Sequence, residues 1–170
     1  MNKKITLLAA AFCLTISSAL AQISITNSTA YTQNFDGLPS TGTSTTNPLP
    51  ADWLRYAANG TTITAGSGTA NSGGFYSAGT GTASDRAMGM LLSGSAKPLY
   101  VGAKFINNTG STIVSAVVSY KCEQWRRGNT NVGLKDTLLV DYATGTDSVH
   151  LGAWTNVPAL TGSSTNSTSS

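Results

Sequence analysis

Charged side chains are scarce in this chain of 170 residues. Lys, Arg, Asp and Glu together make up 10% of the sequence, against a usual share of about 25%. This scarcity excludes a coiled coil or helical bundle, which needs abundant Glu, Lys and Leu. The small net charge and the presence of aromatic residues also argue against intrinsic disorder. The length fits a single domain of about 100–200 residues.

The shortage of His, Glu and Cys limits the chemistry that the chain can perform. His150 is the only histidine, and no G-x-S-x-G elbow accompanies it, so a hydrolase triad is not expected. Glu123 is the only glutamate; with Asp141 it makes a poor glycosidase pair, because the sequence gives no cleft between them. We therefore expect a non-catalytic protein.

Metal and cofactor sites are equally sparse in the sequence. One His and Cys122 cannot supply a closed zinc site. The glycine-rich stretches of the chain lack the glycine pattern of a nucleotide-binding loop. No cofactor is therefore expected. A structural calcium ion remains open, with Asp36, Asp52 and Asp85 as loop candidates; the alternative is that these aspartates cap turns.

The first 21 residues have the three parts of a secretory signal peptide. Lys3 and Lys4 form a positive start, 5–16 is an apolar run too short to span a bilayer, and 19–21 reads Ala-Leu-Ala, a small-x-small cleavage pattern. We predict a signal peptide over 1–21, a mature chain from Gln22, and an extracellular or cell-surface location.

Removal of the signal peptide changes the charge and cysteine counts. Eight lysines and arginines then face seven aspartates and glutamates, a net charge of +1. No basic stripe for nucleic acid results, and no later stretch is a membrane span. Cys122 is left as the single cysteine, so no intrachain disulfide can form. We expect its side chain to be a small buried hydrophobe; the alternative is pairing with another chain.

The mature chain is rich in Thr, Ser, Gly and Asn, and its apolar residues alternate with period two, which predicts strands. A hairpin around Asn59-Gly60 is expected, and 66–84 is a long loop or a weak pair of edge strands. We predict one all-β domain over 22–160, an antiparallel β-sandwich of jelly-roll type, followed by a polar tail over 161–170. The expected strands are 23–26, 31–35, 53–57, 61–64, 86–92, 99–106, 113–126, 137–143 and a short piece at 149–154.

The longest expected strand, 113–126, carries the candidate binding residues. One face reads as core, from Val114 to Cys122, and the other is polar and ends in an aromatic ring. A hairpin with 137–143 would gather charged and aromatic groups on one outer face, as in sugar-binding modules. The ligand-binding candidates are Lys121, Glu123, Trp125 and Arg126. The alternative is that Trp125 caps the core edge and the charges form ordinary surface pairs.

Several segments together resemble the N-terminal β-sandwich domain of large secreted Bacteroidota surface proteins linked to type IX secretion. They are Phe35-Asp36-Gly37-Leu38, Thr41-Gly42-Thr43-Ser44, Leu49-Pro50-Ala51-Asp52-Trp53, Ser84-Asp85-Arg86-Ala87-Met88-Gly89, 102–110, and 118–126 followed by Asp136-Thr137-Leu138. The resemblance covers about 35–160 and implies no catalytic residues. Members of this family continue with further strands and a sorting domain, so the resemblance implies that the chain is a fragment.

Three functions are consistent with these features. The leading one is a secreted or cell-surface interaction module that binds extracellular polysaccharide or is adhesive. The alternatives are a structural spacer that displays other modules, and an accessory domain of a larger secreted hydrolase. The ligand and the oligomeric state are left open.

Overall fold

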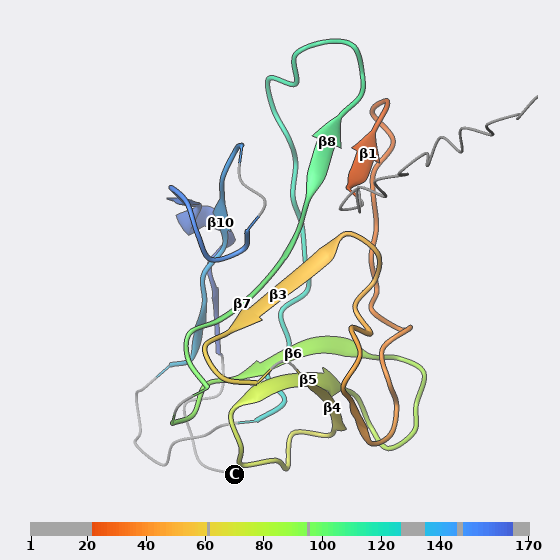
Figure 1. Cartoon of the computed structure of the whole chain (residues 1–170), viewed down its shortest axis with the longest axis vertical. Coiled ribbons are helices and arrows are strands. Elements are labelled where there is room, and N and C mark those ends of the chain that lie inside the picture. Colours follow the sequence, from red (N-terminus) through yellow and green to blue (C-terminus); the bar gives the residue numbers. More distant parts are fainter. Residues whose placement is uncertain (1–21, 61, 95, 127–134, 146–147, 165–170) are drawn as a thin grey trace, which may run out of the picture.

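The computed structural model describes residues 22–60, 62–94, 96–126, 135–145 and 148–164. These residues form short strands, one 3₁₀ turn at Pro158–Leu160 and no α-helix, so the predicted all-β class is confirmed. The strands form a four-stranded sheet and four two-stranded pairs (Figure 1). The predicted signal peptide lies outside the described residues.

The four-stranded sheet has the order β2-β4-β5-β6, in which β4 and β5 run parallel and the other neighbours antiparallel. Its strands are β2 (Thr43–Ser44), β4 (Ile63–Gly66), β5 (Gly74–Ala78) and β6 (Ala87–Leu91). Strand β5 lies in the stretch 66–84, which the sequence predicts as a loop or an edge pair. That prediction was wrong, because β5 is an inner strand and buries Phe75 and Ser77.

Strand β3 (Trp53–Ala57) pairs antiparallel with β7 (Leu99–Ala103), with Trp53 opposite Ala103. The expected hairpin around Asn59-Gly60 is therefore wrong, since β3 does not pair with β4. Strand β3 instead pairs with β7, more than 40 residues farther along the chain, and β4 pairs with β2 and β5. Tertiary pairing therefore overrides the local turn signal.

The three remaining pairs are each two or three residues long. They are β1 (Ile23–Ile25) parallel to β8 (Phe105–Asn107), β9 (Thr137–Leu138) antiparallel to β12 (Gly162–Ser163), and β10 (Asp141–Tyr142) antiparallel to β11 (Thr155–Asn156). Strand β12 lies in the predicted polar tail, so backbone pairing extends beyond residue 160. The expected strand at 149–154 is absent from the described part of the chain.

The expected strand at 31–35 is also absent, and local hydrogen bonds explain why. The Gln33 side chain accepts a hydrogen bond from the Phe35 backbone N–H, and Asn34 accepts one from Asp36 N–H. Phe35 has φ of 64°, in the left-handed region. These side-chain bonds offer the backbone an alternative to a ladder, so the segment forms a turn.

The core is small and centres on Leu38, Leu49, Ile63 and Phe75. Phe35 and Trp53 pack against it and meet edge to face, with ring centroids 4.7 Å apart. The turn at 35–38 therefore contributes apolar side chains to the core although it has no strand.

Arg86 is buried with 2% of its surface exposed and ties the ends of β5 and β6 together. Its guanidinium donates hydrogen bonds to the Ser77 hydroxyl (2.9 Å), the Ser77 carbonyl and the Gly81 carbonyl (3.3 Å). A Cβ at Gly79 would collide with this guanidinium. A buried arginine needs such acceptors, because an unpaired buried charge is costly.

Segment 113–126 does not form the long strand that the sequence predicts. It runs without bend or helical turn, yet no ladder joins it to another described residue. The predicted core face is exposed, with Val114 at 91%, and Cys122 is exposed rather than buried. The expected hairpin with 137–143 is also wrong, because β9 pairs with β12 and β10 with β11.

Arg86→Met tests the buried arginine. The variant leaves three acceptors without donors, and each unsatisfied buried group costs about 1–3 kcal/mol. We expect the free energy of unfolding, measured by urea denaturation, to fall by at least about 3 kcal/mol. Ser77→Ala, which removes one of the three bonds, should cost about 1 kcal/mol. The exposed control Lys97→Met should change stability by less than about 0.5 kcal/mol, and an equal loss in that control would contradict the assignment.

Candidate functional site

Three of the four predicted ligand-binding residues form one contiguous strip. The Lys121 ammonium lies 2.5 Å from one Glu123 carboxylate oxygen, and the Trp125 indole N–H donates to the other oxygen at 3.0 Å. The residues are spaced by two, so an extended backbone directs all three side chains to the same side. We call Lys121, Glu123 and Trp125 the polar–aromatic strip.

Arg126 does not belong to the strip. Its guanidinium donates hydrogen bonds to the backbone carbonyls of Thr69 (3.2 Å) and Ala70. Beside it, Gly68 has φ of 89° and approaches the Trp125 carbonyl so closely that a Cβ would not fit. Arg126 thus anchors the end of segment 113–126 to the β4–β5 loop.

Electrostatics couple the members of the strip. The hydrogen bond from Lys121, followed by the one from Trp125, lowers the pKa of Glu123. The hydrogen bond and charge of Glu123 raise the pKa of Lys121, and the charge of Asp85 contributes in the same direction. Asp85 therefore neighbours the strip, which the sequence could not show because 36 positions separate Asp85 from Lys121.

The opposite side of segment 113–126 faces the C-terminal strands. Tyr120 donates a hydrogen bond to the Leu160 carbonyl, and the Cys122 sulfur lies against Gly162. Burial, followed by the nearby Cys122, raises the pKa of Tyr120. The alternation of side chains expected for a strand thus holds between residues 120 and 125, although this stretch forms no ladder with the described residues.

The three calcium candidates do not gather in one place. Asp36 accepts hydrogen bonds from the Arg86 backbone N–H (3.1 Å) and the Asn34 side chain (2.6 Å). Asp52 has φ of 71° and a buried carboxylate oxygen without a hydrogen-bond partner. Among the described residues, no three His, Cys, Asp or Glu side chains form a group that could hold a metal ion. A calcium site therefore stays a prediction.

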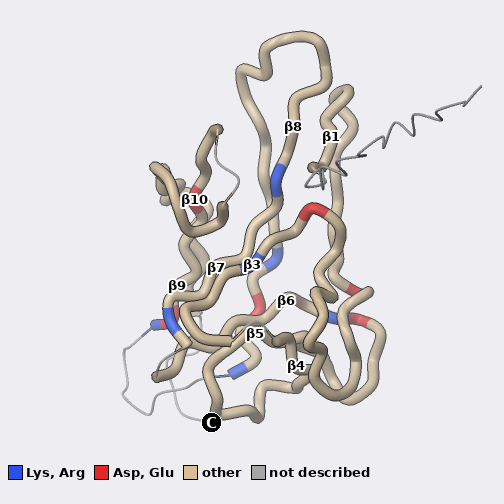
Figure 2. The backbone as a smooth tube through the Cα atoms, viewed as in Figure 1, with Lys and Arg blue, Asp and Glu red and all other residues tan. Residues whose placement is uncertain are grey.

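The described lysine and arginine residues are spread over separate elements (Figure 2). The single histidine is held in a turn, where the Ser148 hydroxyl lies 2.9 Å from His150 Nδ1 and accepts hydrogen bonds from the backbone N–H of His150 and Leu151. The imidazole stacks on Tyr56, with ring centroids 3.4 Å apart. These contacts give His150 a structural role in the turn.

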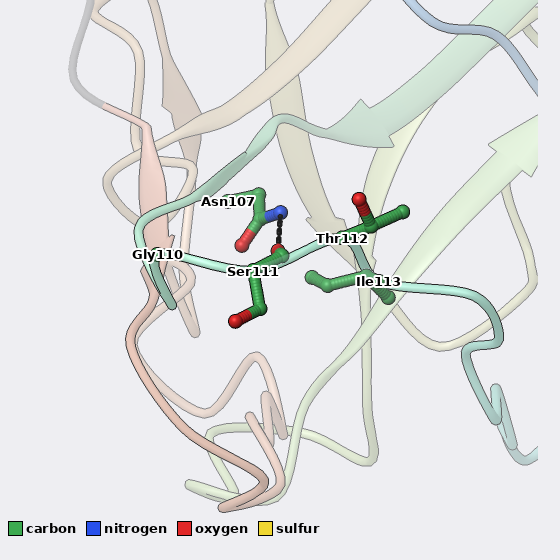
Figure 3. Close-up of a pocket in the computed structure, with 5 residues that line it drawn as sticks. All are labelled: Asn107, Gly110, Ser111, Thr112 and Ile113. Carbon is green, nitrogen blue, oxygen red and sulfur yellow. Dashed lines mark hydrogen bonds between the residues drawn. The ribbon is translucent and has the colours of Figure 1, made fainter.

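A small surface hollow lies in the loop after β8, lined by Asn107, Gly110, Ser111, Thr112 and Ile113 (Figure 3). The Asn107 amide donates to the Ser111 carbonyl at 2.7 Å, and its oxygen accepts from the backbone N–H and the hydroxyl of Thr109. The polar atoms of Asn107 are thus engaged within the loop, which indicates a turn-forming role.

A much larger hollow of about 2640 Å³ lies between β6, β7, segment 113–126 and the stretch 136–143. Ligand pockets for small molecules measure about 300–1,000 Å³. Lys121, Glu123 and Trp125 all border this hollow.

No family model, curated protein or solved structure matches this chain. No helix in the described part of the chain is long and apolar enough to cross a membrane. The resemblance to secreted Bacteroidota surface proteins therefore stays a prediction.

Lys121→Met tests the coupling within the strip. Because Glu123 is the only glutamate, its labelled side-chain carboxyl gives a single carbon resonance in an NMR titration. We expect the variant to raise the pKa of Glu123 toward its ordinary value, and Trp125→Phe to raise it less, because the Lys121 hydrogen bond is the larger cause. The control Lys135→Met should leave the pKa of Glu123 unchanged.

The same coupling gives a pH dependence of stability with a defined sign. The folded pKa of Glu123 is lowered, so its contribution to stability is present above the ordinary pKa and is lost as the pH falls through the folded pKa. This acid-dependent loss should be smaller in Lys121→Met than in the unaltered protein. A Glu123 titration identical in both proteins would contradict the ion pair.

Proposed function

We propose that the protein is an exported, non-catalytic interaction module that binds extracellular polysaccharide through the polar–aromatic strip. One observation carries the proposal: the Trp125 ring, 37% exposed, is fixed by a hydrogen bond to a carboxylate that also binds Lys121. An exposed aromatic ring can stack on a sugar ring, and the charged groups beside it can form hydrogen bonds with sugar hydroxyls.

Each member of the strip has a distinct role in this proposal. The apolar face of the indole stacks on the C–H face of a sugar ring, because tryptophan offers a large apolar surface with a fixed orientation. The Glu123 carboxylate accepts hydrogen bonds from sugar hydroxyls, and the Lys121 ammonium donates to them. The hydrogen bond between Trp125 and Glu123 orients the ring before a ligand arrives, which lowers the ordering cost of binding.

The surroundings of the strip favour a long ligand. The hollow beside it exceeds the size of a small-molecule pocket severalfold. Several sugar units in a row could contact such a surface at once. The predicted signal peptide over 1–21 supports an extracellular site of action, where such polysaccharides occur.

Trp125→Ala tests this function, with Trp154→Ala as a matched control. Both tryptophans are 37% exposed, but the Trp154 indole N–H donates to the Leu151 backbone carbonyl rather than to a carboxylate. Affinity electrophoresis against a panel of neutral and acidic polysaccharides gives the measurement. We expect Trp125→Ala to weaken binding at least about tenfold, corresponding to the loss of about 1.4 kcal/mol, and Trp154→Ala to leave it unchanged.

Three outcomes would favour a different function or a different site. Equal binding by both variants would move the site away from the strip. Absence of binding by the unaltered protein, together with cooperative unfolding, would favour the structural spacer that displays other modules. A hydrolytic activity found only in a longer product of the same gene would favour the accessory-domain function.

A further inference from the structure

The Asn59-Gly60 pair lies on the connection between two strands that do not pair with each other (Figure 1). Strand β3 ends at Ala57, and β4 begins at Ile63. Asn59 is the only asparagine in the sequence that glycine follows. The pair takes no part in a ladder, so its chemistry depends on its own two residues and on the water around them.

The Gly60 backbone is open to solvent. Asn59 and Gly60 are both exposed. Gly60 has φ of 84°, in the left-handed region, and a Cβ built there would meet no atom within 4 Å beyond its chain neighbours. The Gly60 N–H donates no hydrogen bond to any described residue. The Gly60 nitrogen is therefore accessible and is not held by a partner in the described structure.

A free nitrogen after an asparagine can attack the asparagine side chain. The attack closes a five-membered ring, and the two reacting groups are already held together by the chain. The nitrogen must first lose its proton, so a hydrogen bond that holds the N–H slows the attack. A side chain on the attacking residue crowds the nitrogen, and glycine has none. The reaction therefore favours a free N–H and a following glycine.

The other described asparagines lack one or both of these features. In one group the following backbone N–H already donates a hydrogen bond; its members are Asn34, Asn107, Asn108 and Asn156. Asn47 precedes Pro48, which has no N–H. Asn27 and Asn71 each precede a serine, whose side chain crowds the nitrogen. Among the described asparagines, Asn59 alone has both features.

We propose that Asn59 is a site of spontaneous modification, converted to aspartate and isoaspartate by attack of the Gly60 nitrogen. In the first step this nitrogen bonds to Asn59 Cγ, the bond from Cγ to Nδ2 breaks, and ammonia leaves with the proton from Gly60. In the second step water adds to one carbonyl carbon of the succinimide ring, and the bond from that carbon to the ring nitrogen breaks. Opening at Cγ gives aspartate, and opening at the backbone carbonyl gives isoaspartate. Water is the co-reactant, and nothing is oxidised or reduced.

The modification changes the charge of the chain without touching its ladders. Without residues 1–21 the chain has eight positive and seven negative side chains, so one new carboxylate brings the net charge from +1 to zero. Electrostatic repulsion between copies is lowest at zero net charge. Isoaspartate also lengthens the main chain between β3 and β4, outside both strands. The proposal does not depend on the proposed function.

Peptide mass spectrometry tests the site in the purified protein, incubated at physiological temperature. The exchange of ammonia for water raises the mass of the peptide that contains position 59, and isoaspartyl methyltransferase labels the isoaspartate product. We expect conversion at 59 at a rate that rises with hydroxide concentration, because the attacking nitrogen must be deprotonated. A synthetic peptide of sequence 57–62 is the reference. A protein that stays unmodified at 59 while this peptide converts would overturn the proposal.

Two variants identify the reacting groups. Gly60→Ala crowds the nitrogen and should slow conversion at least about tenfold, a rise of about 1.4 kcal/mol in the barrier. Asn59→Gln leaves Gly60 intact, but its longer side chain would have to close a six-membered ring, so we expect isoaspartate labelling to disappear. Labelling of Asn59→Gln at the rate of the unaltered protein would place the modification elsewhere and overturn the proposal.

A third variant separates the effect of structure from that of sequence. Asn108→Gly places a glycine after Asn107, at a position whose backbone N–H donates to the Ile25 carbonyl at 2.8 Å. In the folded variant we expect conversion at 107 to be at least about tenfold slower than at 59. In urea, which removes the hydrogen bond, the two positions should convert at similar rates. Equal rates in the folded variant, or conversion at 59 only in urea, would overturn the proposal.

Discussion

The described structure depends on the pairing of strand β5 along both of its edges. β5 runs parallel to β4 and antiparallel to β6, and it buries Phe75 in the core and Ser77 against Arg86. The Arg86 side chain, bound to Ser77 of β5, also holds the loop that leads into β6 through the Gly81 carbonyl. The Arg86 backbone N–H donates to Asp36 and so holds the turn that carries Phe35. A chain with few large apolar residues thus obtains order from backbone pairing and one buried cation.

Sequence patterns predicted the class of the fold because alternation with period two survives in a charge-poor, Thr-rich chain. They did not predict the pairing. Strands β3 and β4 flank a strong turn signal at Asn59-Gly60 but do not pair with each other: β3 pairs with β7, and β4 with β2 and β5. The inner strand β5 looked like a loop, because Gly74, Ser77 and Ala78 carry small side chains that signal turns when read locally. In the structure, the small residues of this region allow close packing, as at Gly79, where only hydrogen fits beside Arg86.

The polar–aromatic strip was predictable for a local reason. Its residues are separated by two positions, so an extended backbone alone brings them together, with or without a ladder. Arg126 was assigned to the same face by proximity, yet its alternating position turns it toward Thr69 and Ala70. Asp85 was missed as a neighbour of the strip because its approach to Lys121 depends on the loop before β6, which no short pattern encodes.

Segment 113–126 shows how the strip can be held in place by contacts on the other side of the same backbone. Its odd-numbered side chains Lys121, Glu123 and Trp125 form the strip. The even-numbered Tyr120 donates a hydrogen bond to the Leu160 carbonyl, and Arg126 donates to the Thr69 carbonyl, so both ends of this stretch are tied to distant parts of the chain. Because alternate side chains of an extended backbone point to opposite sides, these contacts fix the backbone without covering the strip. Gly68, which lies against the Trp125 carbonyl, adds a third contact directly beneath the indole. The orientation of Trp125 therefore depends on residues more than 50 positions earlier in the sequence as well as on its neighbour Glu123.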